Sequence, residues 1–273
     1  MLHNHYIRFF KITLLTAVLL LEFGCSSMNA KTTQEKPVVG NVPVKMEQRL
    51  NKDITNNFSV KPQKNEITKS VVDYGYRQGD SYLTQYQNDD LVKQIILVEQ
   101  SAAEVNSGKL FLLTKNENSE WQENLQCKAY LGKNGIDKVR EGDAKTPTGD
   151  FGVLMAFGAK DDPGSLVPYT KLSDTMYLCG DKEYYNQFID VSKINHTCSN
   201  NSEHLIRYIP QYNYALFIDY NKEHVYGKGS AIFLHCVGSY PYTLGCVSVT
   251  EENMVKILKA VDKNVRICIY ATK

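Results

Sequence analysis

Short apolar runs rich in β-branched and aromatic residues follow one another from about residue 91 to the end of the chain. Residues 93–100 (KQIILVEQ) and 108–115 (GKLFLLTK) flank the turn-forming stretch SAAEVNS, which is typical of a β-hairpin. Further runs of this kind cover residues 121–132, 149–158, 213–221, 230–237, 245–249 and 265–270. Runs this short favour strands over helices, so residues 91–273 are predicted to form one mainly β domain, a sandwich or a barrel-like sheet.

One helix is predicted near the end of this domain. Thr250 is a suitable N-cap, and Glu251 and Glu252 suit the positive end of the helix dipole. Asn264 is a suitable residue to end the helix, before the last strand. The predicted apolar face consists of Met254, Ile257, Leu258 and Val261, which recur at helical spacing.

The N-terminus has the pattern of an export signal. Arg8 and Lys11 precede an apolar stretch at 12–21, which is shorter than the roughly 20 residues that a membrane-spanning helix needs. Cys25 ends the sequence LEFGC, which resembles a lipoprotein cleavage motif imperfectly. Residues 1–24 are therefore predicted to be a signal peptide, with Cys25 lipidated; the alternative is a simple secretory signal cut a few residues later. In either case the chain is expected in the cell envelope, in the periplasm or at the cell surface, anchored to a membrane if Cys25 carries lipid.

Residues 25–90 are predicted to be a flexible polar tether, because Lys, Asn, Gln, Thr and Ser dominate and three prolines interrupt the stretch. Over the whole chain, 31 basic and 30 acidic residues give a net charge of +1. No cluster of basic residues with interleaved aromatic side chains occurs. Nucleic acid is therefore not an expected partner.

The segment 234–249, LHCVGSYPYTLGCVSV, contains a histidine and two cysteines. Gly245 permits a tight turn before Cys246, and the predicted helix after it would bring backbone N–H donors near the thiol, lowering its pKa and holding an oxyanion. The loop after His235 can fold back, so that its imidazole would accept the thiol proton. Taken alone, this pair is equally compatible with a buried structural thiol and a core histidine. Cys236 should face away from His235 on the same strand and serve packing.

Zinc binding and disulfide formation are two other possible roles of the cysteines. A zinc site from His235, Cys236, Cys246 and His204 would lack C-x-x-C or H-x-x-x-H spacing, so neither a metal nor another cofactor is expected. Seven cysteines in an exported chain leave five for pairing if Cys25 is acylated and Cys246 stays free. The best candidate disulfide pair is Cys179 with Cys198, the only two in one loop-rich insertion.

Several longer stretches together carry a family resemblance. They are DKVREGDAKTPTGDFGVLMAFG (137–158), YYNQF (184–188), SEHL (202–205), YNYALFIDYN and GSAIFLHCVGSYPYTLGCVSVTEENM. Over residues 93–270 the sequence resembles the L,D-transpeptidase family of the YkuD type. The most specific elements are KTPTGDF and the histidine followed by Gly-Cys in the final third.

The resemblance implies a β-rich domain that remodels peptidoglycan. On that pattern Cys246 attacks the carbonyl between the third residue of a stem tetrapeptide and its terminal D-Ala, with His235 as the base. Backbone N–H groups of Leu244, Gly245 and Cys246 would hold the oxyanion. The thioester would pass to an amine of a second stem peptide, to water in a carboxypeptidase, or to a protein lysine. The acceptor stays open.

The sequence also departs from the family pattern. Thr243 and Leu244 stand where the family usually has Ser-His, and Ser248 stands where Arg or Asn is common. These departures put substrate contacts in doubt more than chemistry, because the predicted oxyanion donors are backbone groups. Residues predicted to contact substrate or support the catalytic pair are His204, Gly238, Thr243 and Ser248. A non-catalytic cell-wall-binding lipoprotein with the same fold is the second candidate function.

Overall fold

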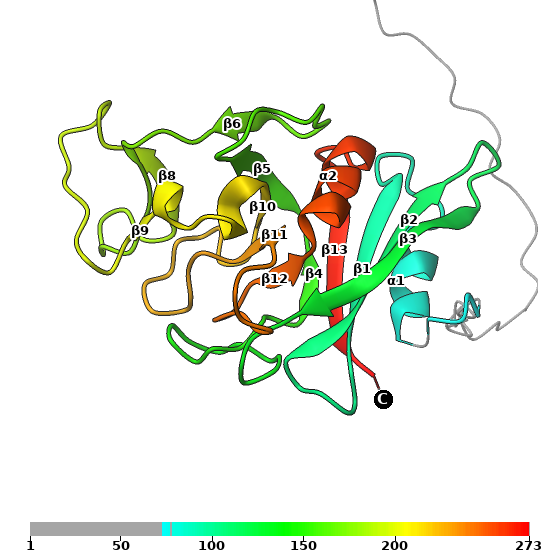
Figure 1. Cartoon of the computed structure of the whole chain (residues 1–273). Coiled ribbons are helices and arrows are strands. Elements are labelled where there is room, and N and C mark those ends of the chain that lie inside the picture. The colour runs from blue at the N-terminus through cyan, green and yellow to red at the C-terminus, as the bar shows by residue number, and fades with distance from the viewer. Residues whose placement is uncertain (1–72, 77, 273) are drawn as a thin grey trace, which may run out of the picture. The chain divides into compact units, whose positions relative to one another are not determined.

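The computed structural model describes residues 73–76 and 78–272, which belong to one compact unit (Figure 1). The predicted signal peptide, the lipidation site at Cys25 and most of the predicted tether lie outside the described residues. The strands are β1 (Gln94–Gln100), β2 (Ser107–Lys115), β3 (Trp121–Tyr130), β4 (Gly149–Phe151), β5 (Val153–Gly158), β6 (Tyr169–Lys171), β7 (Met176–Cys179), β8 (Gln187–Asp190), β9 (Glu203–His204), β10 (Ala215–Ile218), β11 (Phe233–Cys236), β12 (Val247–Val249) and β13 (Arg266–Ala271). The α-helices are α1 (Gly79–Tyr86) and α2 (Glu251–Ala260), and 3-10 turns occupy Leu205–Arg207 and Gln211–Asn213.

The mainly β prediction is confirmed. One ten-stranded sheet has the order β4-β13-β1-β2-β3-β12-β11-β10-β5-β6, and β8-β7-β9 form a small separate sheet. β1 and β2 pair as the predicted antiparallel hairpin, and β1 also pairs in parallel with β13. The strands of the small sheet were not predicted, because each spans only two to four residues and shows no clear apolar alternation.

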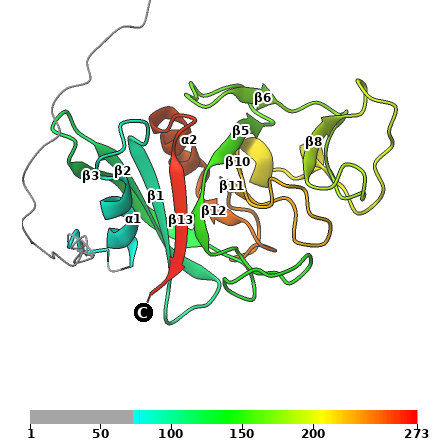
Figure 2. The same ribbon diagram turned by 180° about the vertical axis from the view of Figure 1, so that it is seen from behind.

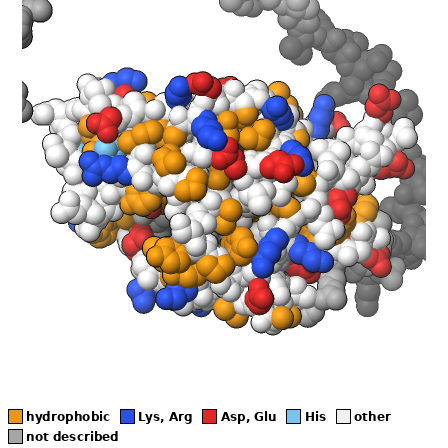
Figure 3. All heavy atoms as spheres, in the orientation of Figure 1, with side chains coloured by type: hydrophobic (Ala, Val, Ile, Leu, Met, Phe, Trp, Pro, Cys, Tyr) orange, Lys and Arg blue, Asp and Glu red, His pale blue; other side chains and the backbone are white. Residues whose placement is uncertain are grey.

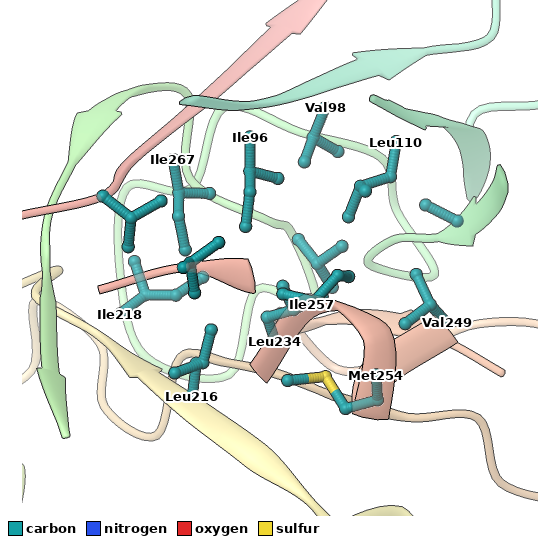
Figure 4. Packing of buried hydrophobic residues seen from close by; sticks show 14 of the residues in the cluster. Ile96, Val98, Leu110, Leu216, Ile218, Leu234, Val249, Met254, Ile257 and Ile267 are labelled. Atoms are coloured by element: carbon teal, nitrogen blue, oxygen red, sulfur yellow. The ribbon is translucent and has the colours of Figure 1, made fainter. Parts of the chain in front are cut away.

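The central strands bury side chains on both of their faces. On β1, Ile96 and Val98 join one core, in which they meet Leu234 of β11 and Ile257 of α2 (Figure 4). Ile95 of the same strand belongs to a second core on the other face. Successive residues of a strand point to opposite faces, so a continuous apolar run such as that of β1 is what a doubly covered strand requires.

Helix α2 starts as predicted but ends early. The Thr250 hydroxyl accepts a hydrogen bond from the Asn253 N–H at 3.3 Å, as an N-cap does. The helix ends at Ala260, well before the predicted Asn264, because Val261 has extended backbone angles. Val261 is nevertheless fully buried, so the predicted apolar face is present and packs into the first core.

The folded region begins before the predicted domain start at residue 91. Helix α1 lies within the range predicted as a tether, yet it packs against β1 and β13 (Figure 2). Leu83 is fully buried in the second core, and its carbonyl accepts a 3.0 Å hydrogen bond from the Trp121 indole N–H. Among the described residues of α1, Leu83 is the one large apolar side chain that is buried. The short polar helix therefore shows no apolar periodicity from which it could be predicted. None of the helices in the described part of the chain has the length and apolarity needed to cross a bilayer.

Truncation of Leu83 tests whether α1 belongs to the domain. We expect Leu83→Ala to lower the free energy of unfolding by about 2–5 kcal/mol, because it leaves a cavity in the second core. Leu91→Ala is the matched control, since Leu91 is 70% exposed and its truncation should cost less than about 0.5 kcal/mol. Urea unfolding of the two variants measures both values, and equal costs would show that α1 contributes nothing to the core.

Candidate active site

A cavity of about 900 Å³ lies between the segment 238–248, strand β11 and the small sheet. Both His235 and Cys246 line it, as do Lys138, Glu203 and Tyr212. The face of the domain that Figure 3 shows carries hydrophobic patches between scattered charges. The volume of the cavity falls within the range of about 300–1,000 Å³ typical of small-ligand sites.

His235 and Cys236 are neighbours on β11, and strand alternation directs their side chains to opposite faces. Leu234 and Cys236 point into the first core, whereas Phe233 shares a third apolar cluster with Cys246 on the opposite face. His235 points to that second face and reaches the cavity. The Cys236 thiol instead contacts the Tyr214 carbonyl at 3.5 Å, so Cys236 is a packing residue, as predicted.

The His235 ring is held in one tautomer. Its Nδ1 lies 2.8 Å from the Cys236 carbonyl oxygen, which can only accept, so Nδ1 carries the proton and Nε2 keeps a free lone pair. The Tyr212 ring stands edge-on to the imidazole with 5.5 Å between centroids. Burial lowers the pKa of His235 to about 4, against the opposing effect of the Cys236 carbonyl. The imidazole is therefore neutral at pH 7 and able to accept a proton at Nε2.

The Cys246 sulfur contacts two backbone groups of the segment 231–233. Its thiol donates to the Ala231 carbonyl at 3.0 Å and accepts from the Phe233 N–H at 3.3 Å. Burial, followed by the charge of Glu203, raises the pKa of Cys246 to about 12, while the Phe233 N–H and Lys138 act in the opposite direction. The prediction of a lowered thiol pKa near the start of α2 is wrong, because β12 separates Cys246 from the helix and burial dominates.

Two threonine hydroxyls hold the turn that carries Cys246. Thr243 Oγ1 donates to the Cys246 carbonyl at 2.7 Å, and Thr146 Oγ1 donates to the same oxygen at 3.1 Å. Gly245 has φ of +151°, and a Cβ there would lie 3.1 Å from both the Ile232 side chain and the Lys145 carbonyl. Glycine is therefore needed at this position for conformational and steric reasons.

One of the three predicted oxyanion donors is already engaged. The Gly245 N–H donates to Thr243 Oγ1 at 3.1 Å, inside the turn. This corrects the expectation for Gly245, whose N–H serves the turn and not the cavity. The N–H groups of Leu244 and Cys246 remain the proposed donors.

Glu203 and Tyr212 form a hydrogen-bonded pair in the same cavity as Cys246 and His235. The Tyr212 hydroxyl donates to Glu203 Oε2 at 2.6 Å, and both side chains line the cavity. Burial, with a smaller effect from Glu141, raises the pKa of Glu203 to about 7, although the Tyr212 hydrogen bond opposes the shift. This pair was not predicted from the sequence, which indicated the neighbouring His204 instead.

Lys138 contributes a buried cation to the cavity wall. Its ammonium lies 2.8 Å from Asp143 Oδ1, and both side chains are almost completely buried. Burial acts to raise the pKa of Asp143, but hydrogen bonds from Lys138 and three backbone N–H groups lower it to about 2. The Asp143 carboxylate accepts hydrogen bonds from the Val139, Arg140 and Lys145 N–H groups and so holds the backbone around it.

Comparison with known proteins decides the family. A family model described as the YkuD L,D-transpeptidase catalytic domain matches residues 82–269. The chain belongs to the L,D-transpeptidase catalytic domain family. No curated protein matches the sequence.

Two solved structures are similar to the chain at low identity. The helical cell shape determining protein Pgp2 from Campylobacter jejuni is 18% identical over 72% of this chain and 56% of its own, with a TM-score of 0.36. L,D-transpeptidase 1 of Mycobacterium tuberculosis is 12% identical over 66% of this chain and 63% of its own, with a TM-score of 0.30. The chain thus spans less than two thirds of the length of either protein, and the family assignment rests on the sequence match.

The L,D-transpeptidase domain brings most of the predicted site residues together. Gly238, Thr243, Leu244 and Ser248 all line the cavity with His235 and Cys246, and Ser248 pairs with His235 in the register of β11 and β12. Leu244, in place of the usual histidine, is 74% exposed. It therefore offers an apolar side chain at the mouth of the cavity.

His204 does not belong to the cavity lining. Its Nε2 lies 2.7 Å from the Asp174 carbonyl oxygen and 3.3 Å from the Asp174 carboxylate. Its ring stacks on the Tyr177 ring, with 4.4 Å between the ring centroids. Because neighbouring residues of a strand face opposite ways, Glu203 takes the place in the wall that was predicted for His204.

Gly245→Ala tests the turn that holds Cys246. We expect the variant to lose about 1–3 kcal/mol of stability through backbone strain and the two close contacts, and to change the rate at which Cys246 is alkylated. Gly75→Ala is the matched control, because Gly75 also has a positive φ of +85° but open space around its Cβ position. Urea unfolding and peptide-resolved mass spectrometry measure the two effects. Equal costs for both variants would mean that the contacts at Gly245 are unimportant.

Glu203→Gln tests the charge beside Cys246. Below pH 7 the raised pKa keeps Glu203 protonated, so wild type and variant should alkylate Cys246 at similar rates. Above pH 7 the wild-type carboxylate disfavours the thiolate, and the variant should react faster by up to about tenfold, as one pKa unit would give. Iodoacetamide labelling against pH measures the ratio. Parallel profiles would contradict the coupling, and Glu183→Gln, an exposed carboxylate, serves as the control.

Proposed function

We propose that the chain is an exported cysteine L,D-transpeptidase that remodels peptidoglycan. The observation that carries the proposal is the shared cavity of Cys246 and His235, with the imidazole tautomer that leaves Nε2 able to accept a proton. The family match supports the same chemistry, because this family acts on peptidoglycan peptides. Export, and anchorage through a lipid on Cys25, belong to the proposal on the N-terminal sequence pattern alone.

In the acylation step, the Cys246 sulfur bonds to the carbonyl carbon that precedes the terminal D-Ala of a stem tetrapeptide. The thiol proton moves to His235 Nε2, and the resulting oxyanion accepts hydrogen bonds from the backbone N–H groups of Leu244 and Cys246. Collapse of the intermediate breaks the carbon–nitrogen bond. His235 returns the proton to the leaving amine, which departs as D-Ala and leaves a thioester on Cys246.

In the second step an acceptor resolves the thioester. An amine of another stem peptide attacks the thioester carbonyl, loses a proton to His235 and forms a cross-link, while Cys246 regains its proton. If water attacks, the same steps give a tripeptide and the enzyme acts as an L,D-carboxypeptidase. A protein lysine would give a wall-anchored protein.

The pKa values indicate that the resting pair is neutral. The pKa of Cys246 is raised to about 12 and the pKa of His235 is lowered to about 4. Proton transfer from sulfur to imidazole must therefore accompany substrate binding or attack. Lys138 favours the thiolate, so it stabilises the negative charge as that charge develops on the sulfur. Substrate that displaces water from the cavity would strengthen this effect.

Release of D-Ala from stem tetrapeptides tests the proposal. We expect the full chain to release D-Ala and Cys246→Ala to abolish the release, because the thioester cannot form. Cys236→Ala is the matched control: this thiol is buried on the opposite face of β11, so the variant should keep activity. Mass spectrometry of the products identifies the acceptor, as a cross-linked dimer or a tripeptide.

The second candidate, a cell-wall-binding lipoprotein without catalysis, gives a different result. The chain would then bind peptidoglycan peptides and leave them unchanged, although Cys246 would still react with an alkylating reagent. That combination in a folded wild-type chain would overturn the enzymatic proposal. The proposed catalytic pair favours the enzyme, since binding alone requires neither a thiol nor a base in the cavity.

A further inference from the structure

A second cluster of reactive side chains lies in the small sheet, apart from Cys246 and His235. Cys179 ends β7, and His196 and Cys198 lie in the segment that joins β8 to β9. One ligand atom from each of these three residues lies within 4.8 Å of the other two. Figures 1 and 2 show that β8 lies at the opposite end of the domain from α1.

Asp181 lies next to this cluster of three residues. Its Oδ2 lies 3.2 Å from His196 Nε2, and the same nitrogen lies 3.5 Å from Cys179 Sγ. We propose that Cys179, Asp181, His196 and Cys198 bind one zinc ion. Two thiolates, an imidazole and a carboxylate are the ligand types that a tetrahedral zinc site uses.

Two of the separations between ligand atoms agree with a tetrahedron around a zinc ion. Zinc bonds of about 2.3 Å to sulfur and about 2.0–2.1 Å to nitrogen place the two ligand atoms about 3.5 Å apart at a tetrahedral angle. This agrees with the 3.5 Å between Cys179 Sγ and His196 Nε2. The corresponding separation of a carboxylate oxygen and an imidazole nitrogen is about 3.4 Å, close to the 3.2 Å between Asp181 and His196.

Outer residues orient these ligands. The Ser202 hydroxyl donates to Cys179 Sγ at 3.7 Å, and the Ser199 N–H donates to Asp181 Oδ2 at 2.9 Å. The His196 ring packs against Tyr184 with 4.6 Å between ring centroids. Such contacts fix the direction of ligand atoms, as they do around known metal sites.

A disulfide between Cys179 and Cys198 is the competing interpretation, and it was the expectation from the sequence, which also predicted no metal. An exported chain favours it, because extracellular compartments are oxidising. A disulfide would join two sulfurs at about 2.05 Å and leave His196 and Asp181 without a function at the same point. The convergence of an imidazole and a carboxylate on the two thiols favours the ion.

The ion would hold one wall of the catalytic cavity. Leu178 and Gly180, on either side of Cys179, line that cavity, and so do Asn201 and Glu203 shortly after Cys198. Zinc would tie these two stretches together. Four protein ligands leave no open position, so the role is structural, and the proposal stands independently of the acyl-transfer chemistry.

Metal content and cobalt substitution test the site. We expect the full chain, isolated from cells without a reductant and with zinc present, to contain one equivalent of zinc. Cobalt in its place should show thiolate-to-metal charge-transfer absorption. His196→Ala and Cys198→Ser should lose the metal, whereas Cys127→Ser, which alters a free thiol on β3, should keep it.

Two further readouts use the unchanged protein and do not depend on variants that fold. Zinc should protect Cys179 and Cys198, and not Cys127, from alkylation, and should slow hydrogen exchange over residues 179–203. A Cys179–Cys198 disulfide in the isolated chain, or equal alkylation with and without zinc, would overturn the proposal. Neither result would bear on D-Ala release, because Cys246 is not a ligand.

Discussion

Burial of β11 on both faces is the constraint on which the rest of the structure depends. One face carries Leu234 and Cys236 into the core beneath α2, and the other carries Phe233 and His235 towards Cys246. Because the strand is held from both sides, it cannot slip by one residue without exchanging these faces. The same packing that stabilises the domain therefore positions the candidate base and the backbone N–H that contacts the sulfur.

Burial also decides the electrostatics of the site. It raises the pKa of Cys246 and lowers that of His235, so both groups are neutral in the resting state. It also raises the pKa of Glu203 to about 7, so this carboxyl group changes its charge near neutral pH. Lys138 with its partner Asp143 retains its ion pair in the same wall. Lys138 thus acts on a neutral Cys246–His235 pair, and its charge favours negative charge as that charge develops on the sulfur.

Local patterns predicted local features well. The β1–β2 hairpin, the Thr250 cap of α2 and the opposite directions of His235 and Cys236 follow from periodicity and capping alone, and the structure has them. Features that depend on distant partners were missed. Helix α1 is ordered by burial of Leu83 against Trp121, and no pattern in its polar sequence indicates that contact.

Strand periodicity was enough to predict the class of the fold, and motifs in several segments were enough to predict the family and the candidate pair Cys246 and His235. Tertiary structure decided which neighbours act on that pair. It placed Glu203 in the cavity instead of His204, directed the Gly245 N–H into the turn, and brought Asp181 and His196 to the thiols of Cys179 and Cys198. The contact between Cys179 and His196 joins residues 17 positions apart, and even the short-range Gly245 contact depends on a backbone conformation that only the packed fold determines.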